Sequence, residues 1–309
     1  MTPAPLFNEV AEGPDDGQGV WLQTSDGKRL RAGFWNAAGP KGTVVLLPGR
    51  SEYVEKYGRT AAALSQSGYA TLTVDWRGQG MSDRALVDPL VGHVTDFAEY
   101  QTDLDVLMSF ARAQGLPQPL HMLAHSMGGT IGLRALMRGL PFRTAVFSGP
   151  MWGILISPAM RPVATVLSAT STLLGYSHRY VLGTGPAIYV TDSPFERNTL
   201  TTNPDMWDYM RRQALAHPEL SLGGPSFGWL HAALTECRAL GRLPSPVLPT
   251  LCAMGARERI VDPAPILARM SRWPNGHLRI VQNSEHEVLM ERPALRDAFL
   301  TDATALFGQ

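Results

Sequence analysis

Short, continuous apolar runs are the feature that most constrains the fold of this chain. The segment Thr43–Leu47 reads TVVLL and ends at a Pro-Gly pair, which is typical of a strand buried on both faces. Comparable runs occur at Tyr69–Val74, Leu120–Ala124 and Thr144–Phe147, and helical patterns lie between them. Because strands that alternate with helices form parallel sheets covered on both sides, the pattern predicts an α/β fold.

The other predicted elements keep this rhythm at both ends of the chain. An antiparallel strand pair, joined by a turn with the sequence Ser-Asp-Gly-Lys, precedes the first buried run. The further strands are expected at Val20–Thr24, Arg29–Asn36, Thr250–Met254 and His277–Val281. The helices are expected around Lys56–Gln66, Asp96–Arg112, Met127–Arg138, Pro265–Arg272 and Pro293–Leu306.

The alternation stops in the middle of the chain. Between Met151 and about Leu234 there are helix-like stretches rich in Trp, Met, Gly and Pro, but no convincing buried strand. A chain of 309 residues can form one large domain with an insertion. We therefore expect an α/β core from residues 1–150 and 236–309, with a helical insertion at residues 151–235.

Composition excludes several classes of protein. Lys plus Arg equals Asp plus Glu, 27 against 27, and no basic stripe is present, so a nucleic-acid partner is not expected. The N-terminus lacks the apolar region of a secretory signal, and the uncharged run Pro162–Ser177 is shorter than a membrane span. Two cysteines, Cys237 and Cys252, fit a reduced cytosolic chain. We expect a soluble cytoplasmic protein.

The strongest local motif is AHSMGG, which joins a buried strand to a helix. Ser126 has a small residue two positions away on each side, Ala124 and Gly128, as a sharp strand-to-helix turn requires. This is the nucleophile elbow G-x-S-x-G with Ala in the first Gly position. Ser126 could instead cap the following helix, but the preceding strand and the small neighbours favour a nucleophile.

A nucleophilic serine needs a base, and one of the eight histidines has a distinctive position. His286 lies in NSEHE, directly after the last predicted strand and before the final helix. In an α/β fold with this elbow, the acid and then the histidine follow the serine along the chain. We therefore predict His286 as general base.

Two carboxylates compete for the role of the acid. Glu258 follows the strand Thr250–Met254 on a loop where it can accept a hydrogen bond from the imidazole. Asp262 is the alternative, but it precedes Pro263 and can cap the next helix. Since capping explains Asp262, the residues favour Glu258.

Stabilising the oxyanion requires two backbone N–H groups that point to one place. One is expected from Met127, the residue after the nucleophile. The other is expected from Arg50, in the loop after TVVLL.

Three segments resemble a known family, the α/β-hydrolases of the lysophospholipase L2 and monoacylglycerol lipase group, which is of the serine aminopeptidase S33 type. They are LPGRSEYVEKY from Leu47, DWRGQGMSDR from Asp75 and SEHEVLME from Ser284. The resemblance spans roughly residues 20–307. It implies an α/β-hydrolase fold whose helical cap follows the sixth strand and covers the active site, and it matches Glu258 to the family's triad acid.

Together the motif and the resemblance predict a serine ester hydrolase that needs neither metal nor organic cofactor. The expected substrate is a lysophospholipid or a monoacylglycerol-like ester, because Met and aromatic side chains in the cap suit an acyl chain. The predicted substrate contacts, which could instead only pack the cap onto the core, are Trp152, Trp207, Phe227 and Trp229.

Two alternatives remain open, and the sequence does not predict an oligomeric state. An aminopeptidase would need an acidic grip on the substrate amine, which Glu196 or Glu219 could supply. A receptor-like protein of the same fold would bind a ligand without catalysis. The apolar cap edge also predicts a transient contact with a membrane surface.

Overall fold

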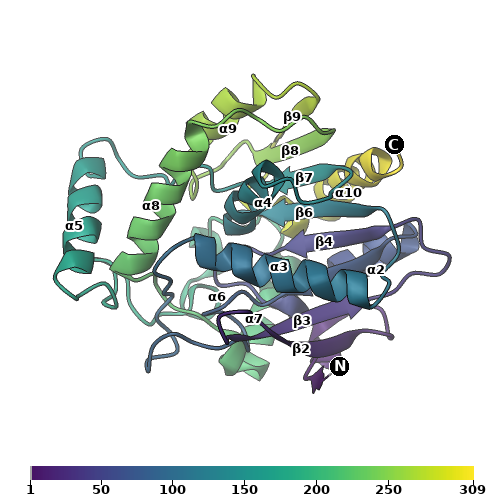
Figure 1. Ribbon diagram of the computed structural model, residues 1–309, viewed down its shortest axis with the longest axis horizontal. Coiled ribbons are helices and arrows are strands. Elements are labelled where there is room, and N and C mark those ends of the chain that lie inside the picture. Colours follow the sequence, from purple (N-terminus) through teal and green to yellow (C-terminus); the bar gives the residue numbers. More distant parts are fainter. Residues whose placement is uncertain (1) are drawn as a thin grey trace.

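A nine-stranded, mostly parallel sheet forms the centre of the molecule (Figure 1). The computed structural model describes residues 2–309. The strand order is β1-β2-β3-β5-β4-β6-β7-β8-β9, and the strands from β5 to β9 in that order run parallel. The strands are β1 (Thr2–Ala4), β2 (Gln18–Gln23), β3 (Arg29–Trp35), β4 (Thr43–Leu47), β5 (Ala70–Val74), β6 (Leu120–His125), β7 (Ala145–Ser148), β8 (Thr250–Gly255) and β9 (Gly276–Val281).

Helices cover both faces of this sheet. Their bounds are α1 (Asn8–Ala11), α2 (Gly58–Gln66), α3 (Ala98–Ala113), α4 (Met127–Met137), α5 (Arg161–Leu173), α6 (Tyr189–Asp192), α7 (Pro204–Ala216), α8 (Phe227–Gly241), α9 (Pro263–Met270) and α10 (Pro293–Phe307). Short 3₁₀ turns are η1 (Val54–Tyr57), η2 (Phe195–Arg197), η3 (Pro218–Leu220) and η4 (Val288–Met290). One apolar cluster joins the sheet to α3 and α4, and a second joins it to α2 and α10.

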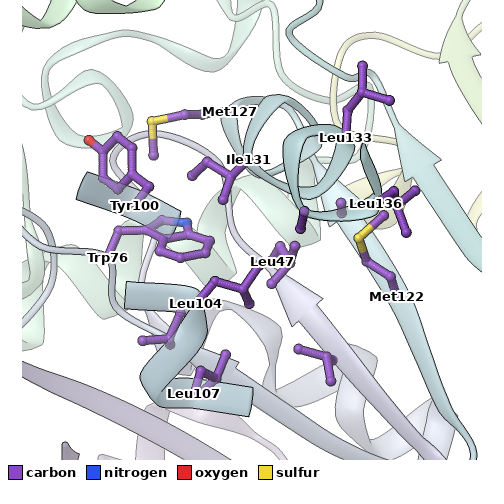
Figure 2. Packing of buried hydrophobic residues seen from close by; sticks show 14 of the residues in the cluster. Leu47, Trp76, Tyr100, Leu104, Leu107, Met122, Met127, Ile131, Leu133 and Leu136 are labelled. Atoms are coloured by element: carbon purple, nitrogen blue, oxygen red, sulfur yellow. The ribbon is translucent and has the colours of Figure 1, made fainter. Parts of the chain in front are cut away.

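The central strands are apolar on both faces because both faces are covered. All five residues of β4 are buried, and so are all six of β6. Figure 2 shows Leu47 at the end of β4 near Ile131 of α4 and Leu104 of α3. This packing fixes where β4 and β6 end, and it is these ends that carry the site.

The structure confirms the predicted fold class. The predicted sixth strand is β7, because the sequence pattern did not reveal the three-residue edge strand β1. The helix predicted from Lys56 begins at Gly58, since Val54–Tyr57 forms the 3₁₀ turn η1.

No strand lies between β7 and β8 among residues 2–309, and this inserted segment (residues 151–235) carries α5, α6, α7 and the start of α8. α8 continues to Gly241 and packs on α4 and α5. In Figure 1 α5 lies at the outer edge of the molecule, beyond α8. Backbone bridges link the segment to loops of the core at Gly92–Pro225 and Ile154–Val261.

Candidate active site

Ser126 sits on a strained turn between β6 and α4. Its φ of 49° and ψ of −116° are rare for a residue with a side chain. The backbone packs so closely here that a Cβ on Gly128 would lie 2.1 Å from the carbonyl oxygen of Leu47. The Ser126 side chain makes no capping hydrogen bond to α4, so capping does not account for a serine at this position.

His286 lies between Ser126 and Glu258. Its Nε2 is 3.0 Å from Ser126 Oγ, and its Nδ1 is 2.7 Å from Glu258 Oε2. An ionised carboxylate only accepts hydrogen bonds, so Nδ1–H donates to Glu258 and Nε2 is left to accept from the serine hydroxyl. This chain of contacts can activate a hydroxyl as a nucleophile.

The loop around Glu258 favours its charged form. Burial alone would raise the pKa of Glu258, but the hydrogen bond from His286 and the amides of Ile260 and Val261 outweigh burial and lower it. These two amides donate to Glu258 Oε1 at 2.8 and 3.1 Å. The carboxylate is therefore held in place as well as ionised.

Asp262 has a different environment from Glu258. It is the N-cap of α9, where its side chain accepts from Ala264 N, and it pairs with Arg161 Nη2 at 2.9 Å. Within residues 2–309 it makes no hydrogen bond to His286. The structure thus brings Glu258 to the imidazole and Asp262 to the junction with α5.

The loop after β4 passes directly beside the serine. A Cβ on Gly49 would lie 3.1 Å from Ser126 Cβ, so only glycine lets the backbone come so close. Met127, as the first residue of α4, has no intrahelical acceptor for its amide. Of the two predicted oxyanion donors, Arg50 directly follows Gly49, and Met127 directly follows Ser126.

A buried charge network supports this loop from beneath. Glu52 accepts hydrogen bonds from the amide of Gly49, from the Tyr57 hydroxyl and from Lys56 Nζ at 2.7 Å. Lys56 also donates to Glu287, the neighbour of His286, at 2.8 Å. Burial would raise the pKa of Glu52, but Lys56 and His125 outweigh it and hold the pKa at about 2.

This network is the largest feature that the sequence interpretation missed. The i, i+4 spacing of Glu52 and Lys56 was the available signal. The ligand atoms of Glu52, His125 and Glu287 lie within 4.8 Å of one another, a spacing that could hold a metal ion. However, the Lys56 ammonium already pairs with both carboxylates, so a cation would have to displace it.

Side chains from the DWRGQG segment hold the same loop from another side. Trp76 Nε1 donates to Pro48 O at 2.9 Å, and Gln79 Nε2 donates to Gly49 O at 3.0 Å. The segment therefore contributes to the site through the position of the Pro-Gly turn.

A cavity of about 540 Å³ opens above Ser126 and His286. Its apolar lining comes mainly from the inserted segment, with Ile260 contributed by the core: Ile188, Val190, Leu200, Leu222 and Ile260. A larger surface hollow of about 680 Å³ lies between α2 and α10 and contains none of the predicted site residues.

The four predicted substrate contacts lie elsewhere. Trp152 is buried against Trp273 and Phe147, and Trp207 is buried in the cluster beneath α7. Trp229 packs on Phe97, and Phe227 starts α8. None of the four is among the residues within 2–309 that line the cavity. Trp152 and Trp229 thus connect the inserted segment to the core through Trp273 and Phe97, and large flat side chains bury much apolar area there.

Comparison with known proteins identifies the family of the chain. Residues 38–293 match the family described as serine aminopeptidase, S33. The chain belongs to this S33 family. Two relatives are 30–31% identical: a probable lysophospholipase L2 of Haemophilus influenzae, with 82% of this chain and 79% of the relative covered, and lysophospholipase L2 of Escherichia coli, with 86% and 80% covered. A monoglyceride lipase of Rattus norvegicus is 26% identical, with 90% and 86% covered.

Solved structures of other proteins share the fold. A soluble variant of monoglyceride lipase from Saccharomyces cerevisiae superposes with a TM-score of 0.71 at 20% identity, with 93% of each chain covered. A carboxyl esterase from Bacillus coagulans gives 0.73 at 15% identity, with 94% and 98% covered. The predicted family and the predicted hydrolase class are confirmed. None of the helices within residues 2–309 is both long and apolar enough to cross a membrane.

Proposed function

We propose that Ser126, His286 and Glu258 form the catalytic triad of a carboxylic-ester hydrolase. Ser126 Oγ attacks the ester carbonyl while His286 Nε2 takes its proton, and the amides of Arg50 and Met127 stabilise the oxyanion. His286 then gives the proton to the leaving alcohol, and water releases the acid from Ser126. The observation that carries this proposal is the unbroken chain of contacts, 3.0 Å from Oγ to Nε2 and 2.7 Å from Nδ1 to Glu258.

The proposed substrates are lysophospholipids and monoacylglycerol-like esters. The relatives named lysophospholipase L2 and monoglyceride lipase support this assignment. The aliphatic lining of the cavity supports it too, since such a wall can bury part of an acyl chain.

The aminopeptidase alternative finds little support in the cavity. Glu196 and Glu219, the acids that the sequence offered, are exposed and do not line it. Asp192 lines it and pairs with no basic side chain in residues 2–309, so it is the remaining candidate for gripping an amine. Hydrolysis of aminoacyl amides that depends on Asp192 would support this alternative.

We also propose that the inserted segment is a cap that contacts membrane surfaces transiently. The proposal is supported by the residues that the segment contributes to the cavity above Ser126, and by Val163, Val166 and Leu173, which α5 exposes. A cytoplasmic location is part of this proposal, and it is supported by two buried free thiols, Cys237 and Cys252.

The decisive experiment is a hydrolysis panel with Ser126→Ala. The panel contains p-nitrophenyl esters, lysophospholipids, monoacylglycerols and aminoacyl amides. Loss of the nucleophile should reduce turnover of every substrate roughly 10⁴-fold or more. Ser193→Ala, which removes another hydroxyl from the cavity wall, is the matched control and should stay within about threefold of the native rate.

Labelling by a fluorophosphonate probe separates the enzyme from the non-catalytic receptor. The native protein should be labelled and Ser126→Ala should not. Native protein that binds lysolipid but neither hydrolyses an ester nor takes the label would exclude the proposed function.

A further inference from the structure

Arg50 has a side chain that the proposed chemistry does not use. Arg50 lines the cavity that holds Ser126 and His286, and its guanidinium reaches Gly223, another residue of the cavity lining. The guanidinium lies over the Trp229 ring, 5.6 Å from the centroid, and a Cβ on Gly92 would come within 2.9 Å of its Nη1. A charged group is thus fixed beside the proposed acyl site.

This guanidinium is largely unpartnered. No carboxylate in residues 2–309 pairs with it, and its one hydrogen bond to the protein there goes from Nη1 to Gly223 O at 2.9 Å. Arginine offers five N–H donors, so most of them are unused. Burial lowers the pKa of Arg50 to about 10 because the charge is desolvated without a counterion.

Two other arginines that are buried or half-buried differ from Arg50. Arg31 pairs with Glu55 and Asp75 at 2.7 Å. Arg84 has no acidic partner, but it donates to four backbone carbonyls, those of Gly78, Gly80, Glu219 and Ser221. Arg84 therefore satisfies its donors within the protein, whereas Arg50 has donors to spare in a cavity wall.

We propose that the Arg50 guanidinium binds the headgroup phosphate of the substrate and so selects phosphate-bearing lysolipids over neutral monoacylglycerols. Arginine matches phosphate oxygens with paired N–H donors, and such charged hydrogen bonds are the strong ones. The Arg50 amide faces the reacting carbonyl in the proposed mechanism. The glycerol that separates carbonyl from phosphate in a lysophospholipid has a span comparable with an extended arginine side chain.

A purely structural role makes a different prediction. If Arg50 only holds the Gly223 segment against the core, its loss should affect all substrates alike. Arg84 contacts the same stretch of the inserted segment through Glu219 and Ser221 and does not line the cavity. Arg84→Met is therefore the matched control for Arg50→Met.

The test compares kcat/KM for 1-lauroyl-glycerophosphocholine, 1-lauroyl-glycerophosphate and monolauroylglycerol, which share one acyl chain. The ratio of each phosphate substrate to the neutral one cancels any general loss of turnover. We expect Arg50→Met to lower this ratio tenfold or more and Arg50→Lys to lower it less, because lysine keeps the charge without the fork. Arg84→Met should change the ratio less than threefold. An equal ratio in native protein and Arg50→Met overturns the proposal.

The inference rests on the proposed lipid-ester function, and a second measurement separates their failures. Dodecyl phosphate and dodecanol compete with p-nitrophenyl butyrate for the native enzyme. Stronger inhibition by the phosphate, lost in Arg50→Met, supports anion binding even if no lysophospholipid is hydrolysed, in which case only the substrate assignment fails. Equal inhibition by both compounds refutes the role of Arg50, whether or not Arg50→Met folds.

Discussion

The core and the inserted segment form opposite walls of one cavity, and they are built differently. The proposed triad lies on turns and loops that follow strand ends, and the strands before Ser126 and Glu258, β6 and β8, are fully buried. The inserted segment contributes loops and the four-residue α6, and the only buried residue of α5 is Ser168. Within the inserted segment α7 is anchored in the second apolar cluster, whereas α5 and the loops around α6 bury few apolar side chains.

The two walls are nevertheless joined at the proposed base. The amides of His286 and Glu287 donate to the carbonyls of Thr199 and Leu200, and Thr201 Oγ1 donates to Met290 O at 2.6 Å. The inserted segment thus helps to place the imidazole. The comparison shows that the proposed triad comes from the core alone, while both walls line the cavity above it.

The largest expected effect is a loss of kcat, and it distinguishes the two candidate acids, Glu258 and Asp262. Glu258→Gln leaves the imidazole without its charged partner, so kcat should fall roughly 10²- to 10⁴-fold. Asp262→Asn removes an equal charge, but its side chain caps α9 and pairs with Arg161 of α5. Its kcat should change less than about threefold, because asparagine caps helices as well as aspartate.

Steady-state kinetics on a soluble p-nitrophenyl ester measure both variants. If Asp262→Asn abolishes turnover while Glu258→Gln stays near the native rate, the acid is misassigned and the contact at 2.7 Å has no catalytic meaning.

The second prediction concerns the buried network that supports the core wall. Glu52→Gln removes one partner of a buried ion pair, so the free energy of unfolding at pH 7 should fall by about 3 kcal/mol. Because the pKa of Glu52 lies near 2 in the folded protein, below its ordinary value of 4.5, its carboxylate stabilises the fold above pH 4.5. That contribution is lost as the pH falls toward 2.

Urea denaturation of native protein and Glu52→Gln between pH 7 and pH 3 tests this sign. The difference in free energy of unfolding between the two proteins should shrink below pH 4.5. At that pH the Glu52 carboxyl of the unfolded wild-type chain takes up a proton, which favours unfolding. Asp105→Asn breaks an exposed pair with Arg138 and should cost less than about 1 kcal/mol at either pH. A Glu52→Gln deficit that is as large at pH 3 as at pH 7 would contradict the assigned pKa.

The core could be predicted from the sequence much better than the inserted segment. Buried strands, the elbow at Ser126 and the loop of His286 obey local rules of spacing and turn geometry, so the core and the proposed triad could be placed from residues alone. The capping geometry of Asp262 could be predicted too, because an aspartate before proline at a helix start has a known local role.

The cavity wall could not be predicted because it depends on long-range packing. Trp152 and Trp207 are side chains that suit an acyl pocket, yet Trp152 is buried against Trp273 of the core and Trp207 against Tyr189 of the inserted segment. The loop residues Ile188 and Leu200 line the cavity without any periodic signal. Likewise, the pairing of Lys56 with Glu287 joins residues 231 positions apart, which no local pattern reveals.

The smallest expected effect belongs to the outer surface of the inserted segment. Val166 and Leu173 on α5 are 59% and 85% exposed. If α5 lies on a membrane during turnover, the double variant Val166→Gln/Leu173→Gln removes apolar area from that contact. The initial rate on lysophospholipid in phosphatidylcholine vesicles should then fall roughly threefold to tenfold, while the rate on a soluble p-nitrophenyl ester, which needs no surface, should stay unchanged.

Val247→Gln is the matched control, because Val247 is 77% exposed but precedes β8, at the end of the sheet opposite the cavity. Because the chain carries no net charge, adding anionic lipid should not raise the native rate. Equal losses on vesicles and on the soluble ester would place the effect of α5 in the fold of the insertion instead of at a lipid surface.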